Sequence, residues 1–309
     1  MGIFRNKIKG EDRQKLWDFF NSFEYEASGA SFSSLYMWRD INEFTWEIIG
    51  DYLCIEGLSH LELEDGTLVH FMMPPLTSTG EYDADKLRET VLEAKRIFED
   101  AGYKFSLRLI PGHMTDIIRE ALPEIQFADD RANYDYIYEV EKLKNFAGRK
   151  LHSKKNHLNY FKNNYQYEYA ELTSEMTPDV MKFIRNFNEK KELPPNEMRL
   201  LKLEEDAMED VFWHLEELGY RGCVILIDGK IQALAAGGLL GSDTIVEHIE
   251  KANTQYRGLY QLVLSEFCKN VAGDIKYINR EEDMDLTNLR DMKLSYKPVK
   301  LLDKYIGTI

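Results

Sequence analysis

A strand-like stretch in the last third of the chain carries two side chains that could take a proton from a nucleophile. In "TIVEHIEK", residues 244–251, strand alternation puts Ile245, Glu247 and Ile249 on one face. A carboxylate between two isoleucines is poorly solvated, and poor solvation makes it a better general base. We therefore expect Glu247 to deprotonate an attacking amine, with His248 as the second candidate. The alternative is a structural Glu247 that is satisfied by a neighbouring lysine or backbone donor.

The loop after this strand leads into a predicted helix, and the start of that helix could bind an anion. The sequence "NTQYRGLYQLVL" places Arg257 and Gly258 in the first helical turn. Free N–H groups and the helix dipole favour an anion there, Arg257 adds positive charge, and a glycine lets a ligand approach the backbone. This pattern predicts the binding of a phosphate-bearing donor. The residues that we expect to bind it are Gln255, Tyr256, Arg257, Gly258 and Tyr260.

A basic segment in the middle of the chain is a second candidate anion site. The protein has a formal net charge of −15, yet residues 142–167 hold seven Lys or Arg and no Asp or Glu. A solvated amphipathic helix with Leu151, Leu158 and Phe161 on its apolar side would explain the lysines, but not the total exclusion of acids. We interpret the segment as a site for a phosphate-bearing donor or acceptor, with the solvated helix as the alternative. The contacts that we predict are Arg149, Lys154, Lys155 and His157.

Polar residues also follow the last clear strand of the sequence. In "INREEDMD", residues 278–285, the strand ends in five polar residues, Asn279 to Asp283, of which the first three are Asn279, Arg280 and Glu281. Polar side chains at the end of a strand are well placed to meet a substrate. We predict that these three residues contact the acceptor or a phosphate. The alternative is a surface loop with scattered charge.

These candidates need elements that hold them, and the sequence predicts helices alternating with strands. In the second half, "GCVILID", "KIQALAAGGLL" and "TIVEHIEKA" are strands joined by tight turns, and a helix follows at about residues 258–271. The pair Gly237–Gly238 inside the middle strand is typical of a β-bulge. In the first half, Asp83 caps and Gly102 ends a long helix. The mixture of hairpins and helices indicates an α+β fold with mixed sheets flanked by helices.

The net charge and the cysteines indicate which partners and which compartment to expect for this protein. The negative net charge repels phosphate backbones and anionic lipids, so a DNA partner is disfavoured, whereas a small anion in a locally basic pocket is compatible. The cysteines Cys54, Cys223 and Cys268 are scattered, which suits a reducing compartment.

No apolar run approaches the roughly 18 residues of a membrane span. We expect a cytoplasmic protein without integral membrane association, and no metal site, because its His and carboxylate residues lack metal-ligand spacing.

The tripeptide Tyr256-Arg257-Gly258 resembles a motif of the GNAT acyltransferase superfamily. In that superfamily a strand runs into Tyr-Arg-Gly-x-Gly, which cradles the coenzyme A pyrophosphate. The positions of the next glycine and of the following small residue hold Tyr260 and Leu262 in this chain. These larger side chains crowd the phosphate loop and disfavour coenzyme A.

A longer resemblance covers the segments "RKLHSKKNHLNYF" and "YINREEDMDLTNLRDMKLSYKP". They look like the DUF2156 family, which is related to the C-terminal domain of phosphatidylglycerol lysyltransferase and resembles the FemABX aminoacyl transferases. The resemblance implies two tandem GNAT-like domains, which we place at residues 1–141 and 142–309, with the site in the second. It also implies a lysine in "KLSYKP" that stabilises the oxyanion of the attacked ester. We assign Lys293 and Tyr296 to that region, with Lys297 as the competing lysine.

Together these patterns predict transfer of an acyl or aminoacyl group from a phosphate-bearing carrier to an amine or hydroxyl. The donor stays open between acyl-coenzyme A and aminoacyl-tRNA. The net charge disfavours a tRNA, Tyr260 and Leu262 disfavour coenzyme A, and the family resemblance favours a tRNA-borne donor. The alternative is a non-catalytic module that keeps the GNAT fold and binds an anionic ligand. The sequence predicts no oligomeric state.

Overall fold

The computed structural model of the chain describes residues 2–59, 69–189 and 191–309. Contacts divide the chain into two compact units: unit 1 is Met1–Asp135 with Leu302–Ile309, and unit 2 is Tyr136–Leu301. The sequence places its boundary after residue 141, whereas unit 2 begins at Tyr136, and the last residues of the chain return to unit 1.

Unit 1 is a mixed sheet with helices, in the order β1-β2-β3-β4-β6-β15-β7, with β5 paired to β3. Among its described strand pairs, β4 pairs with β6 in parallel and the others are antiparallel. The strands are β1 (Asn6–Lys7), β2 (Thr45–Ile49), β3 (Tyr52–Ser59), β4 (Val69–Met72), β5 (Leu76–Thr77), β6 (Leu107–Pro111), β7 (Gln126–Asp129) and β15 (Lys304–Thr308). The helices are α1 (Asp12–Lys15), α2 (Trp17–Asn21), α3 (Phe32–Trp38), α4 (Ala84–Asp100) and α5 (Thr115–Ala121).

Helix α4 confirms the long helix that the sequence predicts in the first half. The side chain of Asp83 accepts a hydrogen bond from the backbone N–H of Lys86, and Gly102 follows the helix at φ +84°. Both are local signals, because each acts within a few residues of the helix end. One side of α4 is buried in the core of unit 1, through Leu87, Val91, Ala94 and Phe98.

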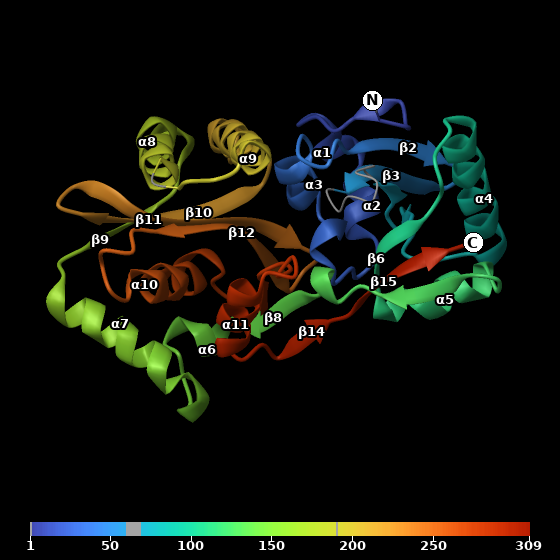
Figure 1. Ribbon diagram of the computed structural model, residues 1–309. Helices are drawn as coiled ribbons and strands as arrows, with labels where there is room; N and C mark the ends of the chain where they lie inside the picture. Colours follow the sequence, from blue (N-terminus) through green and yellow to red (C-terminus); the bar gives the residue numbers. More distant parts are fainter. Residues whose placement is uncertain (1, 60–68, 190) are drawn as a thin grey trace. The chain divides into compact units, whose positions relative to one another are not determined.

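Unit 2 is a second mixed sheet, in the order β14-β8-β13-β12-β11-β10-β9. Helices α8 and α9 lie on one side of its strands β10 to β12, and α10 lies on the other (Figure 1). The strands are β8 (Asp135–Glu139), β9 (Glu168–Glu171), β10 (Tyr220–Ile227), β11 (Lys230–Leu240), β12 (Thr244–Ala252), β13 (Tyr277–Asn279) and β14 (Lys300–Leu302). The helices are α6 (Val140–Lys144), α7 (His152–Asn164), α8 (Thr177–Asn188), α9 (Pro195–Trp213), α10 (Leu259–Glu266) and α11 (Thr287–Ser295).

A β-bulge interrupts the pairing of β11 with β12. Ala236 lies opposite Ile249, but Gly237 lies opposite Glu247, so His248 is an extra residue in β12. A Cβ atom on Gly237 would lie 1.9 Å from the Val246 carbonyl oxygen, so only glycine fits there. The bulge predicted at the glycine pair is therefore confirmed. Its effect on β12 overturns the simple alternation assumed from the sequence, because side chains beyond His248 change face.

Strands β12 and β13 part shortly after they pair. Their parallel register runs from Thr244 opposite Tyr277 to Val246 opposite Asn279. Among the described residues, no strand pairs with the remainder of β12 on that side. Arg280 follows β13 directly at this point, which places its side chain beside the second half of β12.

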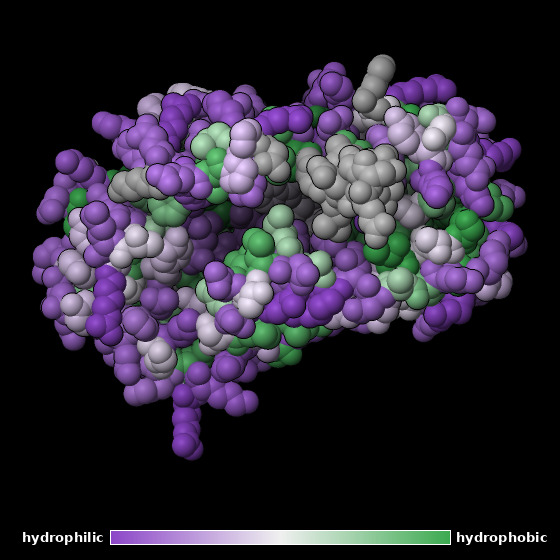
Figure 2. All heavy atoms as spheres, viewed as in Figure 1, coloured by the Kyte–Doolittle hydropathy of each residue, from purple (hydrophilic) through white to green (hydrophobic). Residues whose placement is uncertain are grey.

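The exterior shown in Figure 2 is dominated by hydrophilic side chains, with apolar residues in small patches. No helix within residues 2–59, 69–189 and 191–309 is both long enough and apolar enough to cross a bilayer.

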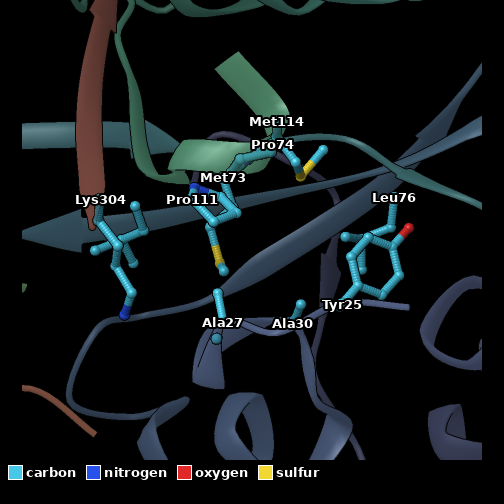
Figure 3. Close-up of a pocket in the computed structure, with 11 residues that line it drawn as sticks. Tyr25, Ala27, Ala30, Met73, Pro74, Leu76, Pro111, Met114 and Lys304 are labelled. Atoms are coloured by element: carbon cyan, nitrogen blue, oxygen red, sulfur yellow. The ribbon is translucent and has the colours of Figure 1, made fainter. Parts of the chain in front are cut away.

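Unit 1 contains a pocket of about 350 Å³, open solvent at its mouth included. Its lining is mainly apolar, and the side chains of Met73, Leu76 and Met114 are among those that border it (Figure 3). The charged lining residue, Lys304, donates a 2.6 Å hydrogen bond to buried Asp135, so its charge is neutralised within the unit. The pocket therefore lacks the free polar groups that acyl transfer needs.

Candidate functional site

Arg280 binds two carboxylates of strand β12. Its Nε donates a 2.5 Å hydrogen bond to Glu247, and its Nη2 donates to Glu250. The side chains of Arg280 and Glu247 are 4% and 2% exposed, so this is a buried group, which we call the Arg280 cluster. The Arg280 guanidinium thus binds two carboxylates that are three residues apart in β12. Both point to the same side of the strand because the bulge at His248 adds one residue between them.

Each member of the Arg280 cluster keeps one polar atom without a partner. Among the described residues, no hydrogen-bond partner reaches Glu247 Oε1, Glu250 Oε1 or Arg280 Nη1, and all three atoms are shielded from solvent. Unpaired buried polar atoms are costly, and native proteins keep few of them. These three atoms are therefore the polar groups of the cluster whose hydrogen-bonding capacity is unused among the described residues.

The charges of the Arg280 cluster do not balance when all three groups are ionised. Burial raises the pKa of Glu250 to about 8; Arg280 opposes this rise and Glu247 adds to it. Burial alone would lower the pKa of Arg280, but the carboxylates of Glu247 and Glu250 raise it well above its usual value. At neutral pH the cluster is therefore an Arg280–Glu247 ion pair beside a largely protonated Glu250.

Helix α7 and the residue directly after helix α11 each place a side chain close to the cluster. The Lys154 ammonium lies 4.0 Å from the centre of the Tyr296 ring, and the Arg280 guanidinium lies 5.2 Å from it. Burial lowers the pKa of Lys154, and the positive charge of the nearby Arg280 lowers it further. Burial raises the pKa of Tyr296 to about 12, and its hydroxyl accepts a 2.8 Å hydrogen bond from Gln261. The structure thus brings together Lys154 and Tyr296, to which the sequence assigns separate roles.

The segment that follows Arg280 has an unusual backbone. Glu281, Met284 and Asp285 adopt φ values of 55°, 51° and 59°, in the left-handed region that side chains disfavour. Such a backbone persists where surrounding contacts enforce it. Side-chain and backbone contacts from β8, β12 and α11 enforce it here.

Buried polar contacts fix this segment at several points. Asp283 accepts hydrogen bonds from the Tyr136 hydroxyl at 2.5 Å and from Arg290 at 2.9 Å. The Lys293 ammonium donates to the carbonyl oxygens of Arg280, at 2.6 Å, and of Glu282. Lys293, which the sequence assigns to the oxyanion, is thus placed where it orients the backbone that carries Arg280.

Two further predicted residues pair with each other beside the cluster. His248 Nδ1 lies 2.8 Å from Glu281 Oε1, and the His248 ring lies 5.6 Å from the ring of Tyr220. Asn279 is fully buried, and its side-chain oxygen accepts a 2.9 Å hydrogen bond from the N–H of Glu281. These contacts hold the turn at the end of β13.

The start of helix α10 differs from the sequence-based expectation. The helix begins at Leu259, and Gly258 precedes it at φ +90°. A Cβ atom on Gly258 would lie 2.2 Å from the carbonyl oxygen of His157 in α7. The close approach that this glycine permits is therefore made by helix α7, where the sequence predicts a ligand. Helix α7 packs against the start of α10 at the place expected for a phosphate.

The other predicted donor-binding residues line the outside of this contact. Arg257 is exposed, and its guanidinium lies 4.6 Å from the centre of the Tyr160 ring. It forms no ion pair with the residues that the structure describes. Gln255 is exposed, whereas Tyr256 packs on Tyr165 with ring centres 5.3 Å apart. Burial raises the pKa of Tyr260, and the charge of Glu250 in the Arg280 cluster raises it further. Tyr260 is therefore near this cluster.

The basic segment divides into paired and unpaired cations. Lys142, Lys144 and Lys162 pair with Glu139, Glu141 and Glu266, respectively. The remaining cations form no ion pair within the described part of the chain, and we call them the α7 cation group: Arg149, Lys150, Lys154 and Lys155.

The α7 cation group lies at the N-terminal end of helix α7. Acidic side chains are the ones favoured at this end of a helix. Helix α7 has no acidic residue in its first turn and no side-chain cap. Cations at a helix N-terminus oppose the helix dipole, so their clustering there is unfavourable until an anion binds. His157, which the sequence groups with them, lies further along the helix and contributes its carbonyl oxygen to the Gly258 contact.

Glu250, Gln261 and Arg290, the partner of Asp283, are candidate site residues that the sequence does not single out. Glu250 could have been found from the glycine pair of β11, because a bulge there shifts the phase of the facing strand. Gln261 and Arg290 carry no comparable signal, since their partners lie in distant parts of the sequence.

Solved structures of known proteins share this architecture. A conserved protein of unknown function from Bacteroides thetaiotaomicron is 28% identical, with a TM-score of 0.85 over 99% of both chains. L-PGS from Bacillus licheniformis is 13% identical, with a TM-score of 0.63 over 99% of this chain and 93% of that one. FemX is 7% identical, with a TM-score of 0.59 over 96% of each chain. The fold is therefore α+β, with two tandem GNAT-like domains.

A family model matches almost the whole chain and shows its family. Residues 20–307 match the family model described as phosphatidylglycerol lysyltransferase, C-terminal, and the chain belongs to this family. An uncharacterized curated protein from Mycoplasmoides gallisepticum is 25% identical over 178 residues, or 56% of this chain. That match covers 55% of the relative, so the chain spans about half the length of the curated protein that it matches.

Proposed function

We propose that this protein transfers an aminoacyl group from aminoacyl-tRNA to an amine or hydroxyl acceptor, and that the Arg280 cluster is the reaction centre. The observation that carries the proposal is a buried guanidinium between two carboxylates, each with an unused polar atom, where β12 and β13 part. Membership of the lysyltransferase family supports aminoacyl transfer as the reaction class.

Two observations support aminoacyl-tRNA over coenzyme A as the donor. The carbonyl oxygen of His157 would lie 2.2 Å from a Cβ atom on Gly258, so helix α7 occupies the backbone approach at the start of α10. The α7 cation group provides four positive charges that no described acid neutralises, and a nucleic-acid backbone neutralises several charges at once. A locally basic surface can bind tRNA although the whole chain is acidic, because charges beyond roughly 8–10 Å are screened.

In the proposed reaction, the acceptor nitrogen or oxygen attacks the carbonyl carbon of the aminoacyl ester. A new C–N or C–O bond forms, the ester C–O bond breaks, and the ribose oxygen of the tRNA leaves. Arg280 Nη1, a donor without a partner among the described residues, stabilises the negative charge that develops on the carbonyl oxygen. Lys293 acts indirectly, since its ammonium orients the carbonyl oxygens of Arg280 and Glu282.

The test is a transfer assay with a mixture of radiolabelled aminoacyl-tRNAs and a panel of acceptors that includes phosphatidylglycerol vesicles and small amines. The wild-type protein is expected to move label to one acceptor class, and Arg280→Gln is expected to lower kcat by about 100-fold or more. Arg185→Gln is the matched control, because Arg185 forms an exposed ion pair with Glu209 in the same unit. If no donor is consumed while tRNA still binds, the protein is a binding module and the proposal is wrong.

A further inference from the structure

Within the Arg280 cluster the two carboxylates differ in access. The side chain of Glu247 is 2% exposed, whereas that of Glu250 is 12% exposed. Glu247 bonds the Nε of Arg280, on the chain side of the guanidinium, and Glu250 bonds the terminal Nη2. Glu250 is therefore the less buried of the two carboxylate side chains, and its Oε1 is still shielded from solvent.

Glu250 also has an oxygen that is free to accept. Its Oε1 has no partner among the described residues, while Arg280 holds the carboxylate in place. The bulge at His248 creates this arrangement, because without the extra residue Glu250 would face away from Glu247. The geometry thus provides a held carboxylate with one available lone pair.

The groups around Glu250 come from every element packed against it. Glu247 lies on the same strand, and the nearest cations are Arg280, Lys293 and Lys154. The other titratable neighbours are Tyr260, Tyr296, Cys223 and Cys268. Burial and the charge of Glu247 raise the pKa of Glu250 to about 8, although the three cations lower it. A base in this range suits proton transfer near neutral pH, because it is strong and a fraction of it is ionised.

We propose that Glu250 Oε1 accepts the proton of the attacking amine or hydroxyl, and that Glu247 acts as the positioning residue for Arg280. This inference rests on the proposed function. As the new C–N or C–O bond forms, the N–H or O–H proton moves to Glu250 Oε1. As the ester C–O bond breaks, the departing ribose oxygen takes that proton, so the carboxylate is restored and no other reactant is needed.

The test compares pH profiles of kcat in the transfer assay from pH 5.5 to 9.5. Wild-type kcat is expected to rise with pH and to level off above about 8, and Glu250→Gln should lower kcat about 100-fold or more and remove this rise. Glu250→Asp should recover part of the rate. Glu209→Gln, which removes an exposed carboxylate in the same unit, should leave both rate and profile unchanged.

The outcomes separate this inference from the proposed function. If wild-type protein transfers the aminoacyl group and Glu250→Gln keeps both its rate and its pH profile, Glu250 is not the proton acceptor and the proposed function stands. If the same profile is lost in Glu247→Gln alone, Glu247 is the base and the inference is wrong. If wild-type protein transfers nothing from any aminoacyl-tRNA, the proposed function itself fails, and the inference with it.

Discussion

Arg280 Nε lies 2.5 Å from a carboxylate oxygen of Glu247, and this contact crosses the point where β12 and β13 separate. The residue that the sequence favours as a general base is thus the ion-pair partner of a buried guanidinium. The second carboxylate, Glu250, shares the same guanidinium and has the raised pKa. The bulge at His248 accounts for both facts.

Loss of the Arg280 side-chain charge should destabilise the protein strongly. Arg280→Gln removes the ion-pair partner of the buried Glu247 and Glu250, and breaking a buried ion pair costs about 3–5 kcal/mol. Urea unfolding measures the change. Arg185→Gln, which breaks an exposed pair, should cost less than about 1 kcal/mol. Equal losses in the two variants would contradict the buried cluster.

Removal of the Glu250 charge should stabilise the protein increasingly as pH rises. The pKa of Glu250 is raised from 4.5 to about 8 in the folded state. Its contribution to stability is therefore full below about pH 4.5 and is lost as pH rises through 8. Glu250→Gln avoids this loss, so its unfolding free energy should exceed that of wild type by about 1–4 kcal/mol at pH 9.

The same comparison at pH 5 should show little difference, since Glu250 is then protonated in the folded state. Glu209→Gln serves as the control, because it removes an exposed carboxylate. A Glu250→Gln variant that is less stable than wild type at pH 9 would show that the ionised carboxylate stabilises the cluster, contrary to this account.

The packing of α7 onto Gly258 gives a test of two glycines with similar backbones. Gly258 and Gly273 have φ values of +90° and +57°, but a Cβ atom would clash only at Gly258, where the His157 carbonyl oxygen lies 2.2 Å away. Gly273→Ala should cost about 1 kcal/mol, from backbone strain alone. Gly258→Ala should cost at least about 2 kcal/mol more, because α7 must shift. Similar thermal unfolding of the two variants would mean that α7 does not pack there.

The α7 cation group should govern the binding of tRNA. If Arg149 and Lys155 each neutralise a phosphate, the double variant with glutamine at both positions should lower the slope of log K against log salt by about 2. Lys202→Gln on α9 removes an exposed lysine that pairs with Asp206, and it should leave the slope unchanged. Filter binding or anisotropy at several salt concentrations measures both. A slope that is the same in all three proteins would exclude this surface as the contact.

Local signals made part of the fold predictable. Asp83 and Gly102 mark the ends of α4 within one turn of each end, and the glycine pair of β11 marks the bulge. The return of β15 to unit 1 was not predictable, because it depends on pairing with β6 across almost 200 residues of chain.

The candidate site shows the same limit. The residue types make Glu247, Arg280 and Lys154 candidates. Only the fold shows that the Arg280 guanidinium binds Glu247 and lies, like the Lys154 ammonium, close to the Tyr296 ring. The sequence does not single out Glu250, because simple strand alternation puts it on the face opposite Glu247. A single extra residue reverses the faces of all residues beyond it. The sequence predicts a ligand at Gly258, whereas the structure places the His157 carbonyl oxygen there, because a glycine does not reveal what approaches it.

The most direct test of the central claim is a single-turnover reaction with two labelled donors in one tube, aminoacyl-tRNA and acetyl-coenzyme A, and with an acceptor from the panel. We predict that wild-type protein removes label from aminoacyl-tRNA and delivers it to the acceptor, that Arg280→Gln does so about 100-fold more slowly or worse, and that acetyl-coenzyme A is untouched. Transfer from acetyl-coenzyme A alone, or transfer from aminoacyl-tRNA that Arg280→Gln leaves unchanged, would contradict the account.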